Sequence, residues 1–165
     1  MIDRVDEHDR PVGCVPRGKA LELGANFRTV HVFVYHGREL LLQQLAPTRD
    51  RHPARWGSSV AAYLHTGESY EQAAQRRLRE ELGLEGMLSR VGKTRMKDER
   101  SLKFVALYTL YDGPAEIRDA AHIAALRYWD RGELQETIAE TPRSFTPTFL
   151  HVYRYLEQRA LTPRI

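Results

Sequence analysis

Residues 62–84 read Ala62-Tyr-Leu-His-Thr-Gly-Glu68-Ser-Tyr-Glu-Gln-Ala-Ala-Gln-Arg76-Arg77-Leu-Arg-Glu80-Glu81-Leu-Gly83-Leu84. Ser69 is followed three residues later by Gln72, which is the spacing of a capping box and predicts a helix that begins at Tyr70. Gly83 predicts the end of this helix, because glycine readily adopts the left-handed conformation that closes a helix. Apolar side chains at helical spacing predict one buried side, formed by Ala73, Ala74, Leu78 and Leu82.

The polar side of this helix carries its charge near the C-terminal end. A helix turns about 100° per residue, so Arg77, Glu80 and Glu81 fall within one arc and face one place. Carboxylate oxygens are the ligands that Mg²⁺ prefers, and the two glutamates supply them. A surface cluster of ion pairs, which contributes little to stability, has the same pattern.

The segments on either side of this helix predict a mixed α+β fold in a single domain, residues 1–165. Alternating and β-branched patterns, bounded by turn residues, predict strands at 29–35, 39–45, 56–64, 87–96, 102–111 and 122–129. Asp130 is placed to cap a helix over 133–140, and Pro147 opens a last helix. There is no repeat and no domain linker.

Composition excludes several classes of protein. The net charge of +3 comes with no run of Lys and Arg dense enough for a nucleic-acid site, so no specific nucleic-acid partner is expected. The longest apolar stretch, residues 30–35, is far too short to span a membrane. The charged N-terminus predicts no signal peptide. Cys14 is the single cysteine, which rules out an intrachain disulfide and favours the reducing cytoplasm.

The stretch at 62–84 resembles the signature of the Nudix hydrolases, G-x5-E-x7-R-E-U-x-E-E-x-G-U, where U is a bulky aliphatic residue. The positions that fit in register are Glu68, Arg76, Leu78, Glu80, Glu81, Gly83 and Leu84. Two positions depart from it, since Ala62 stands in place of the first glycine and Arg77 in place of the first helical glutamate. Flanking segments over most of the chain look like the Nudix branch close to isopentenyl diphosphate isomerase.

The resemblance implies a mixed β-sheet between helices and a reaction in which Mg²⁺ (or Mn²⁺) helps water to cleave a diphosphate linkage. It makes Glu80 and Glu81 metal ligands and catalytic residues, with Glu68 supporting them and Arg76 orienting these acids. The partner is a small phosphorylated substrate, a nucleoside diphosphate derivative, and a homodimer is compatible with the family. The expected substrate-side residues are Arg28, Arg55, His65 and Arg77.

Three interpretations of the acidic arc remain open. Metal binds through Glu80 and Glu81, helped by Glu68 or a loop acid, and hydrolysis proceeds. Alternatively, hydrolysis is lost and Arg77 replaces the metal as the anion partner in a nucleotide- or phosphate-binding module. In the third, the charges form only a surface cluster. The loop acids considered for the first interpretation are Asp98, Glu99, Asp112 and Glu116.

Isomerase activity is not expected from the residues present. The isomerase that the chain resembles uses a cysteine before the signature, followed by a glycine and a histidine. The matching residues here, Val60-Ala61-Ala62-Tyr63, contain neither a thiol nor an imidazole. Phe27 stands where a metal-binding histidine would precede Arg28, and Cys14 lies elsewhere in the sequence.

Overall fold

The structure is a computed structural model, and it describes residues 1–111 and 115–161. Three α-helices are present in this part of the chain, α1 (Tyr70–Leu82), α2 (Arg131–Glu140) and α3 (Pro147–Leu161). None of them has the length and apolar character needed to cross a membrane. The strands are β1 (Ile2–Val5), β2 (Pro11–Val15), β3 (Phe27–His36), β4 (Glu39–Leu45), β5 (Trp56–Gly57), β6 (Val60–Tyr63), β7 (Ser89–Asp98), β8 (Ser101–Tyr111) and β9 (Ile123–Trp129).

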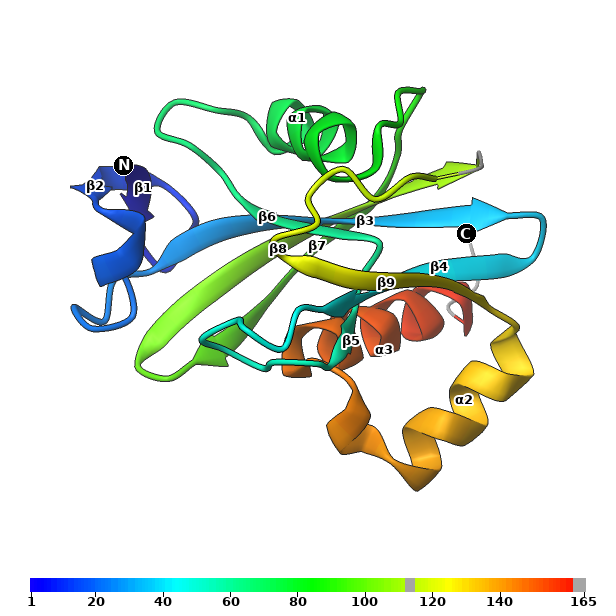
Figure 1. Cartoon of the computed structure of the whole chain (residues 1–165). Helices are drawn as coiled ribbons and strands as arrows, with labels where there is room; N and C mark the ends of the chain where they lie inside the picture. Colours follow the sequence, from blue (N-terminus) through cyan, green and yellow to red (C-terminus); the bar gives the residue numbers. More distant parts are fainter. Residues whose placement is uncertain (112–114, 162–165) are drawn as a thin grey trace.

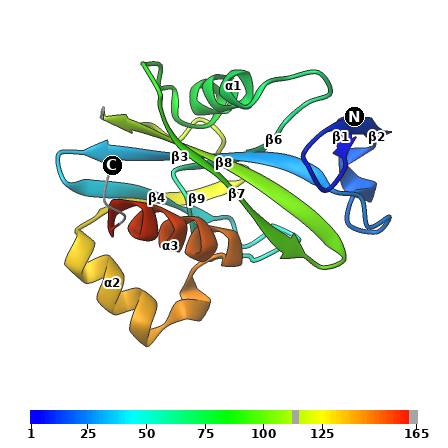
Figure 2. The same cartoon turned by 180° about the vertical axis from the view of Figure 1, so that it is seen from behind.

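The larger sheet is mixed and lies between the helices. Its strands run in the order β5-β4-β3-β8-β7, with β6 paired to β3 and β9 paired to β4. β3 and β8 are parallel, whereas the other pairings in this sheet are antiparallel. Figures 1 and 2 show α1 on one face and α2 and α3 on the other, while β1 and β2 form a separate hairpin at one end. The predicted α+β class is therefore confirmed.

Alternation along β3 divides the apolar core into two layers. Val32 belongs to the cluster that contains Leu78 of α1. Phe33, the next residue, belongs to the cluster on the other face and lies 5.9 Å, between ring centroids, from Phe149 of α3. Successive side chains of a strand point to opposite faces of the sheet, so one strand holds both layers of helices in place.

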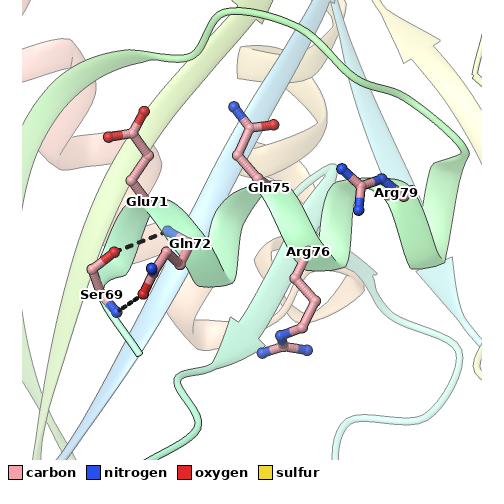
Figure 3. A pocket seen from close by; sticks show the side chains of 6 residues that line it. All are labelled: Ser69, Glu71, Gln72, Gln75, Arg76 and Arg79. Atoms are coloured by element: carbon pink, nitrogen blue, oxygen red, sulfur yellow. Dashed lines mark hydrogen bonds between the residues drawn. The ribbon is translucent and has the colours of Figure 1, made fainter. Parts of the chain in front are cut away.

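Helix α1 begins and ends where the sequence predicts. The Ser69 hydroxyl accepts a hydrogen bond from the Gln72 amide at 3.1 Å, and the Gln72 side chain accepts one from the Ser69 amide at 2.9 Å (Figure 3). Gly83 closes the helix with a φ of 64°, in the left-handed region. Leu78 and Leu82 are fully buried, which determines the directions in which the charged side chains leave the helix.

The strand predicted over residues 56–64 is wrong as a single element, because two separate strands occupy this segment. β5 pairs with β4, and β6 pairs with β3. The hydroxyl of Ser59, between them, accepts from the Val34 amide at 2.8 Å and donates to the Leu41 carbonyl at 2.5 Å. β3 and β4 pair with each other only next to their hairpin turn. The Ser59 hydroxyl bridges their backbones where the strands separate.

Candidate functional site

The charged arc lies in the last turns of α1, and Arg77 is at its centre. Its Nη1 lies 2.8 Å from Glu80 Oε2, and its Nη2 lies 2.5 Å from Glu81 Oε1. These contacts are the i+3 and i+4 pairs that helical spacing allows. The cation occupies carboxylate oxygens that a metal ion would otherwise use.

Glu81 is the buried member of this group, with 5% of its surface exposed. Its Oε2 accepts a hydrogen bond at 3.0 Å from Nε2 of Gln43, which also donates to the Ser59 carbonyl at 3.0 Å. Burial raises the pKa of Glu81, and the charge of Arg77 opposes that rise. Arg77 itself stays charged, because its attraction to Glu81 and Glu80 outweighs the effect of burial and raises its pKa.

A third carboxylate near Arg77 comes from the segment between β8 and β9. Asp119 Oδ2 lies 3.6 Å from Arg77 Nη2. The Arg118 amide donates to the Glu81 carbonyl at 2.9 Å, so this segment is joined to the end of α1, beside which it passes in Figure 1. The sequence analysis did not identify Asp119. The sequence could have shown only that Asp119 lies three residues before His122. Its position beside α1 depends on how the sheet brings the two segments together.

Arg76 lies between two acids of the signature, Glu68 and Glu80. It contacts both oxygens of Glu68, at 2.8 and 2.9 Å, and donates to the Tyr63 carbonyl at 3.2 Å. Its Nη1 lies 3.6 Å from Glu80 Oε2. The hydrogen bonds from Arg76 hold the pKa of Glu68 below its usual range. This geometry suits the predicted orienting role of Arg76, and it places Glu68 at the start of the helix, where Arg76 links it to Glu80.

Arg28 is not free to face a substrate in this structure. Its Nε lies 2.6 Å from Asp9 Oδ1, and its Nη2 donates to the Asp9 carbonyl at 2.6 Å. Asp9 also accepts hydrogen bonds from Lys93 at 2.6 Å and from the Tyr70 hydroxyl at 2.7 Å. Arg28 therefore holds the loop between β1 and β2, and a role in phosphate binding would require it to leave Asp9.

Two further substrate-side candidates lie on the segments that lead to the site. Arg55 immediately precedes β5, and His65 lies in the turn before α1, where its backbone amide donates to Glu68 at 2.9 Å. Within residues 1–111 and 115–161, the structure records no side-chain contact between either residue and Glu80 or Glu81. Their roles stay predictions.

Among the loop acids proposed as helpers of the metal, Asp98 and Glu99 lie where β7 turns into β8, whereas the Glu116 amide donates to the Leu82 carbonyl at 3.2 Å, beside the end of α1. Asp98 contacts Arg51 at 2.7 Å and Lys103 at 3.0 Å. Burial opposes ionisation of Asp98, but these two cations lower its pKa to about 2. Lys103 also donates to Thr148 of α3, on the face of the sheet opposite α1. Glu99 and Glu116 are exposed, and Asp112 lies outside the described residues.

A hollow on the outer face of α1 does not contain the acids of the arc. Figure 3 shows the side chains that line it, which are Ser69, Glu71, Gln72, Gln75, Arg76 and Arg79. It is open to solvent, and neither Glu80 nor Glu81 contributes to its walls. The candidate site is therefore the surface between the end of α1 and the segment before β9.

The residues present can be tested for their fit to a divalent ion. Glu80 and Glu81 offer the oxygen ligands that Mg²⁺ and Mn²⁺ prefer, but Arg77 contacts both side chains. Within the part of the chain that the structure describes, no group of three or more His, Cys, Asp or Glu is arranged to hold a metal ion. In the arrangement that the structure shows, Arg77 occupies oxygens of both glutamates, so a divalent ion would have to displace it.

Comparison with known proteins identifies the family and the fold. The chain is 33% identical over 162 residues to the isopentenyl-diphosphate Delta-isomerase of Nocardia farcinica, and the match covers 92% of this chain and 91% of that protein. The crystal structure of DR0079 from Deinococcus radiodurans is similar with a TM-score of 0.72 and 24% identity, over 84% of this chain and 88% of that one.

A further similar structure is a bifunctional NMN adenylyltransferase/ADP ribose pyrophosphatase from Francisella tularensis, complexed with AMP and a Mn ion. It has a TM-score of 0.62 and 19% identity, over 85% of this chain and 44% of that one. A model of the NUDIX domain matches residues 25–149, which include α1 and the segment that carries Asp119. Since this match spans most of the chain, the protein belongs to the Nudix family.

Proposed function

We propose that this protein is a hydrolase that cleaves the diphosphate linkage of a nucleoside diphosphate derivative with the help of Mg²⁺ or Mn²⁺. The observation that supports this most strongly is that two acids of the Nudix signature, Glu80 and Glu81, lie together at the end of α1, within a domain that matches the Nudix family. The class of ligand is suggested by the similar bifunctional NMN adenylyltransferase/ADP ribose pyrophosphatase from Francisella tularensis, which is complexed with AMP and a Mn ion.

Each charged residue of the arc has a role in this proposal. Glu80 and Glu81 would hold the divalent ion, which screens the charge of the phosphates and lowers the pKa of a bound water. Arg76 keeps Glu80 in place through its contacts with Glu68. Arg77, once released, presents a guanidinium that pairs well with phosphate oxygens. Arg55 and His65 would contact the substrate from the segments beside it.

A second candidate function is supported by the position of Arg77. Because Arg77 already pairs with Glu80 and Glu81, the same fold could act as a phosphate-binding module that neither holds a metal nor cleaves its ligand. The two functions differ in a measurable property, which is whether turnover occurs and depends on the divalent ion.

Isomerase activity is not part of the proposal, although a relative carries that name. Ala61 lies in β6 at the position of the cysteine in the isomerase pattern, and its side chain supplies no nucleophile or acid. Cys14 lies in β2, in the other sheet, and is exposed. The methyl group of Ala61 has no acidic proton to transfer, so the residues present argue for a different reaction.

The test is release of phosphate or nucleotide from ADP-ribose, ADP and CDP, with Mg²⁺, with Mn²⁺ and with a chelator. We expect turnover that requires the metal and falls at least about tenfold in Glu81→Gln, since even residues that only support metal ligands affect activity this much. Glu71→Gln, an exposed change in the first turn of the same helix, is the matched control. Binding of these compounds without turnover, equal with and without metal, would support the binding module instead.

A further inference from the structure

Asp119 and His122 form a side-chain pair beside the acidic arc. His122 Nδ1 lies 2.9 Å from Asp119 Oδ1 and 2.8 Å from Asp119 Oδ2. The same Oδ2 lies 3.6 Å from Arg77 Nη2. The pair therefore adjoins the group formed by Arg77 with Glu80 and Glu81, and the proposed function gives it no role so far.

Backbone hydrogen bonds hold this pair between two elements. On one side, the Arg118 amide donates to the Glu81 carbonyl at 2.9 Å, which joins the segment to α1. On the other side, the Ala46 amide donates to the His122 carbonyl at 2.9 Å, at the end of β4. The Ile123 amide closes the turn by donating to the Asp119 carbonyl at 2.9 Å. A group held in this way keeps its direction relative to the acids of α1.

The hydrogen bond determines which nitrogen of His122 can act as a base. An ionised carboxylate only accepts hydrogen bonds, so Nδ1 carries the hydrogen and Nε2 keeps its lone pair in the neutral ring. The structure records no protein partner for Nε2 in residues 1–111 and 115–161. The His122 side chain is 53% exposed, whereas that of Asp119 is 19% exposed. About half of the His122 side chain is therefore accessible to water, while that of Asp119 is mostly covered.

We propose that His122 is the catalytic base of the hydrolysis and that Asp119 is its positioning residue. This inference rests on the proposed function. Nε2 takes a proton from a water molecule, and the water oxygen forms a bond to a phosphorus of the diphosphate. The bond between that phosphorus and the bridging oxygen breaks, and its electron pair leaves with the departing phosphate group. The protonated imidazole then gives its proton to that group or to solvent.

The charges around His122 suit this role. Asp119 stabilises the protonated ring that forms in the step, as an acid partner does for a histidine base. On the side of α1, Arg77 contacts Asp119, and Arg77 in turn contacts Glu80 and Glu81. A turn with Asp at its first position is common for conformational reasons alone. This turn preference explains why Asp119 contacts Nδ1 of His122. It does not explain why Asp119 also contacts Arg77.

The first test uses the full chain with Mg²⁺ and the most active compound among ADP-ribose, ADP and CDP. A general base typically contributes 10²–10⁴-fold, so we expect His122→Asn to lower kcat at least about 100-fold with little change in KM. We also expect the variant to lose the acidic limb of the kcat–pH profile and to be partly rescued by added imidazole. Asp119→Asn lowers kcat and displaces that limb.

His8→Asn is the control, because His8 is exposed and also lies near a carboxylate, Glu7 at 3.4 Å. Wild-type kcat and an unchanged pH profile in His122→Asn would overturn the inference.

A second measurement separates this inference from the proposed function. Histidine ring signals are followed by NMR while α,β-methylene-ADP, a diphosphate that is not hydrolysed at that linkage, is added in the presence of Mg²⁺. We expect the His122 signals to shift and the His8 signals to stay in place. If the wild type turns over no compound, the proposed function fails, and a shifted His122 signal still places this residue beside the bound diphosphate. An unshifted His122 signal with saturated binding would contradict the inference, whatever the turnover.

Discussion

At the scale of single residues, Arg77 changes the charge of the site. Replacing a carboxylate with a guanidinium changes the local charge by two units, and a cation a few Å from an incoming Mg²⁺ repels it by a few kcal/mol, at an effective dielectric of about 20. The helical spacing allows Arg77 to pair with Glu80 or Glu81, and the structure contains both contacts. The sequence does not predict the third contact, with Asp119, because the two residues lie far apart in the chain.

The first prediction therefore concerns Arg77→Glu. We expect this change to raise the affinity for Mn²⁺ more than tenfold, because it removes the repelling charge and adds an oxygen ligand to the arc. Calorimetric titration of the wild type and the variant measures this. Arg79→Glu introduces the same charge change on the same helix, but Arg79 is exposed and pairs with Glu85 rather than with the arc. An equal gain in both variants would mean that overall charge, and not the site, controls metal binding.

At the scale of elements, α1 is the part of the fold that local sequence determines best. Its capping box, its glycine end and its apolar side all occur where the pattern places them. Segment 56–64 is the opposite case, since the same kind of local pattern predicts one strand there and the chain forms two. The difference arises because a cap depends on residues within one helical turn, whereas a strand boundary depends on its partner strands.

The second prediction tests the start of α1. Ser69→Ala removes the acceptor for the Gln72 amide and should cost about 1 kcal/mol in the free energy of unfolding. Unfolding in urea, followed by circular dichroism, measures the loss. Ser69→Asp keeps an acceptor at the cap and should stay close to the wild type. A loss of equal size in both variants would show that the capping hydrogen bond is not the source of the stability.

At the scale of the whole molecule, two buried aspartates tie distant parts of the chain together. Asp9 joins the N-terminal hairpin to β3, α1 and β7 through Arg28, Tyr70 and Lys93. Burial opposes ionisation of Asp9, but its hydrogen bonds outweigh burial and lower its pKa. Asp98 joins Arg51 of the loop before β5 to Lys103 of β8. Both aspartates are thus more acidic in the folded chain than in the unfolded one.

The third prediction follows from the sign of these shifts. A carboxyl whose pKa is lowered by folding contributes stability that is complete above its unfolded pKa and is lost as the pH falls through its folded pKa. For Asp98 that interval runs from 3.8 down to about 2. We expect the free energy of unfolding, measured in urea at several pH values, to begin falling near pH 6.5, because burial lowers the pKa of His31 from 6.5 to about 3 and the folded chain resists its protonation. The part due to the aspartates should be lost as a further, steeper fall between pH 4 and pH 2.

Asp9→Asn separates the contribution of one aspartate from the rest. Removing one partner from a buried ion pair costs about 3 kcal/mol, so the variant should lose about this much stability at pH 6 and less at pH 2. Asp50→Asn is the control, because Asp50 is exposed. If Asp9→Asn kept wild-type stability at both pH values, the hairpin would not be held by this residue.

The sequence by itself determined the elements and chemistry that depend on neighbours in the chain. These are α1 with both of its ends, the helical spacing that allows Arg77 to reach the two glutamates, and the signature that indicates the family. The tertiary structure alone decided which distant residues meet. In the folded chain, Arg28 binds Asp9, Asp98 lies on the face of the sheet opposite α1, and Asp119 lies near the acids of α1. The reason is physical, since helix caps and i+4 pairs form within one or two turns, whereas these contacts exist only after the sheet has brought separate segments together.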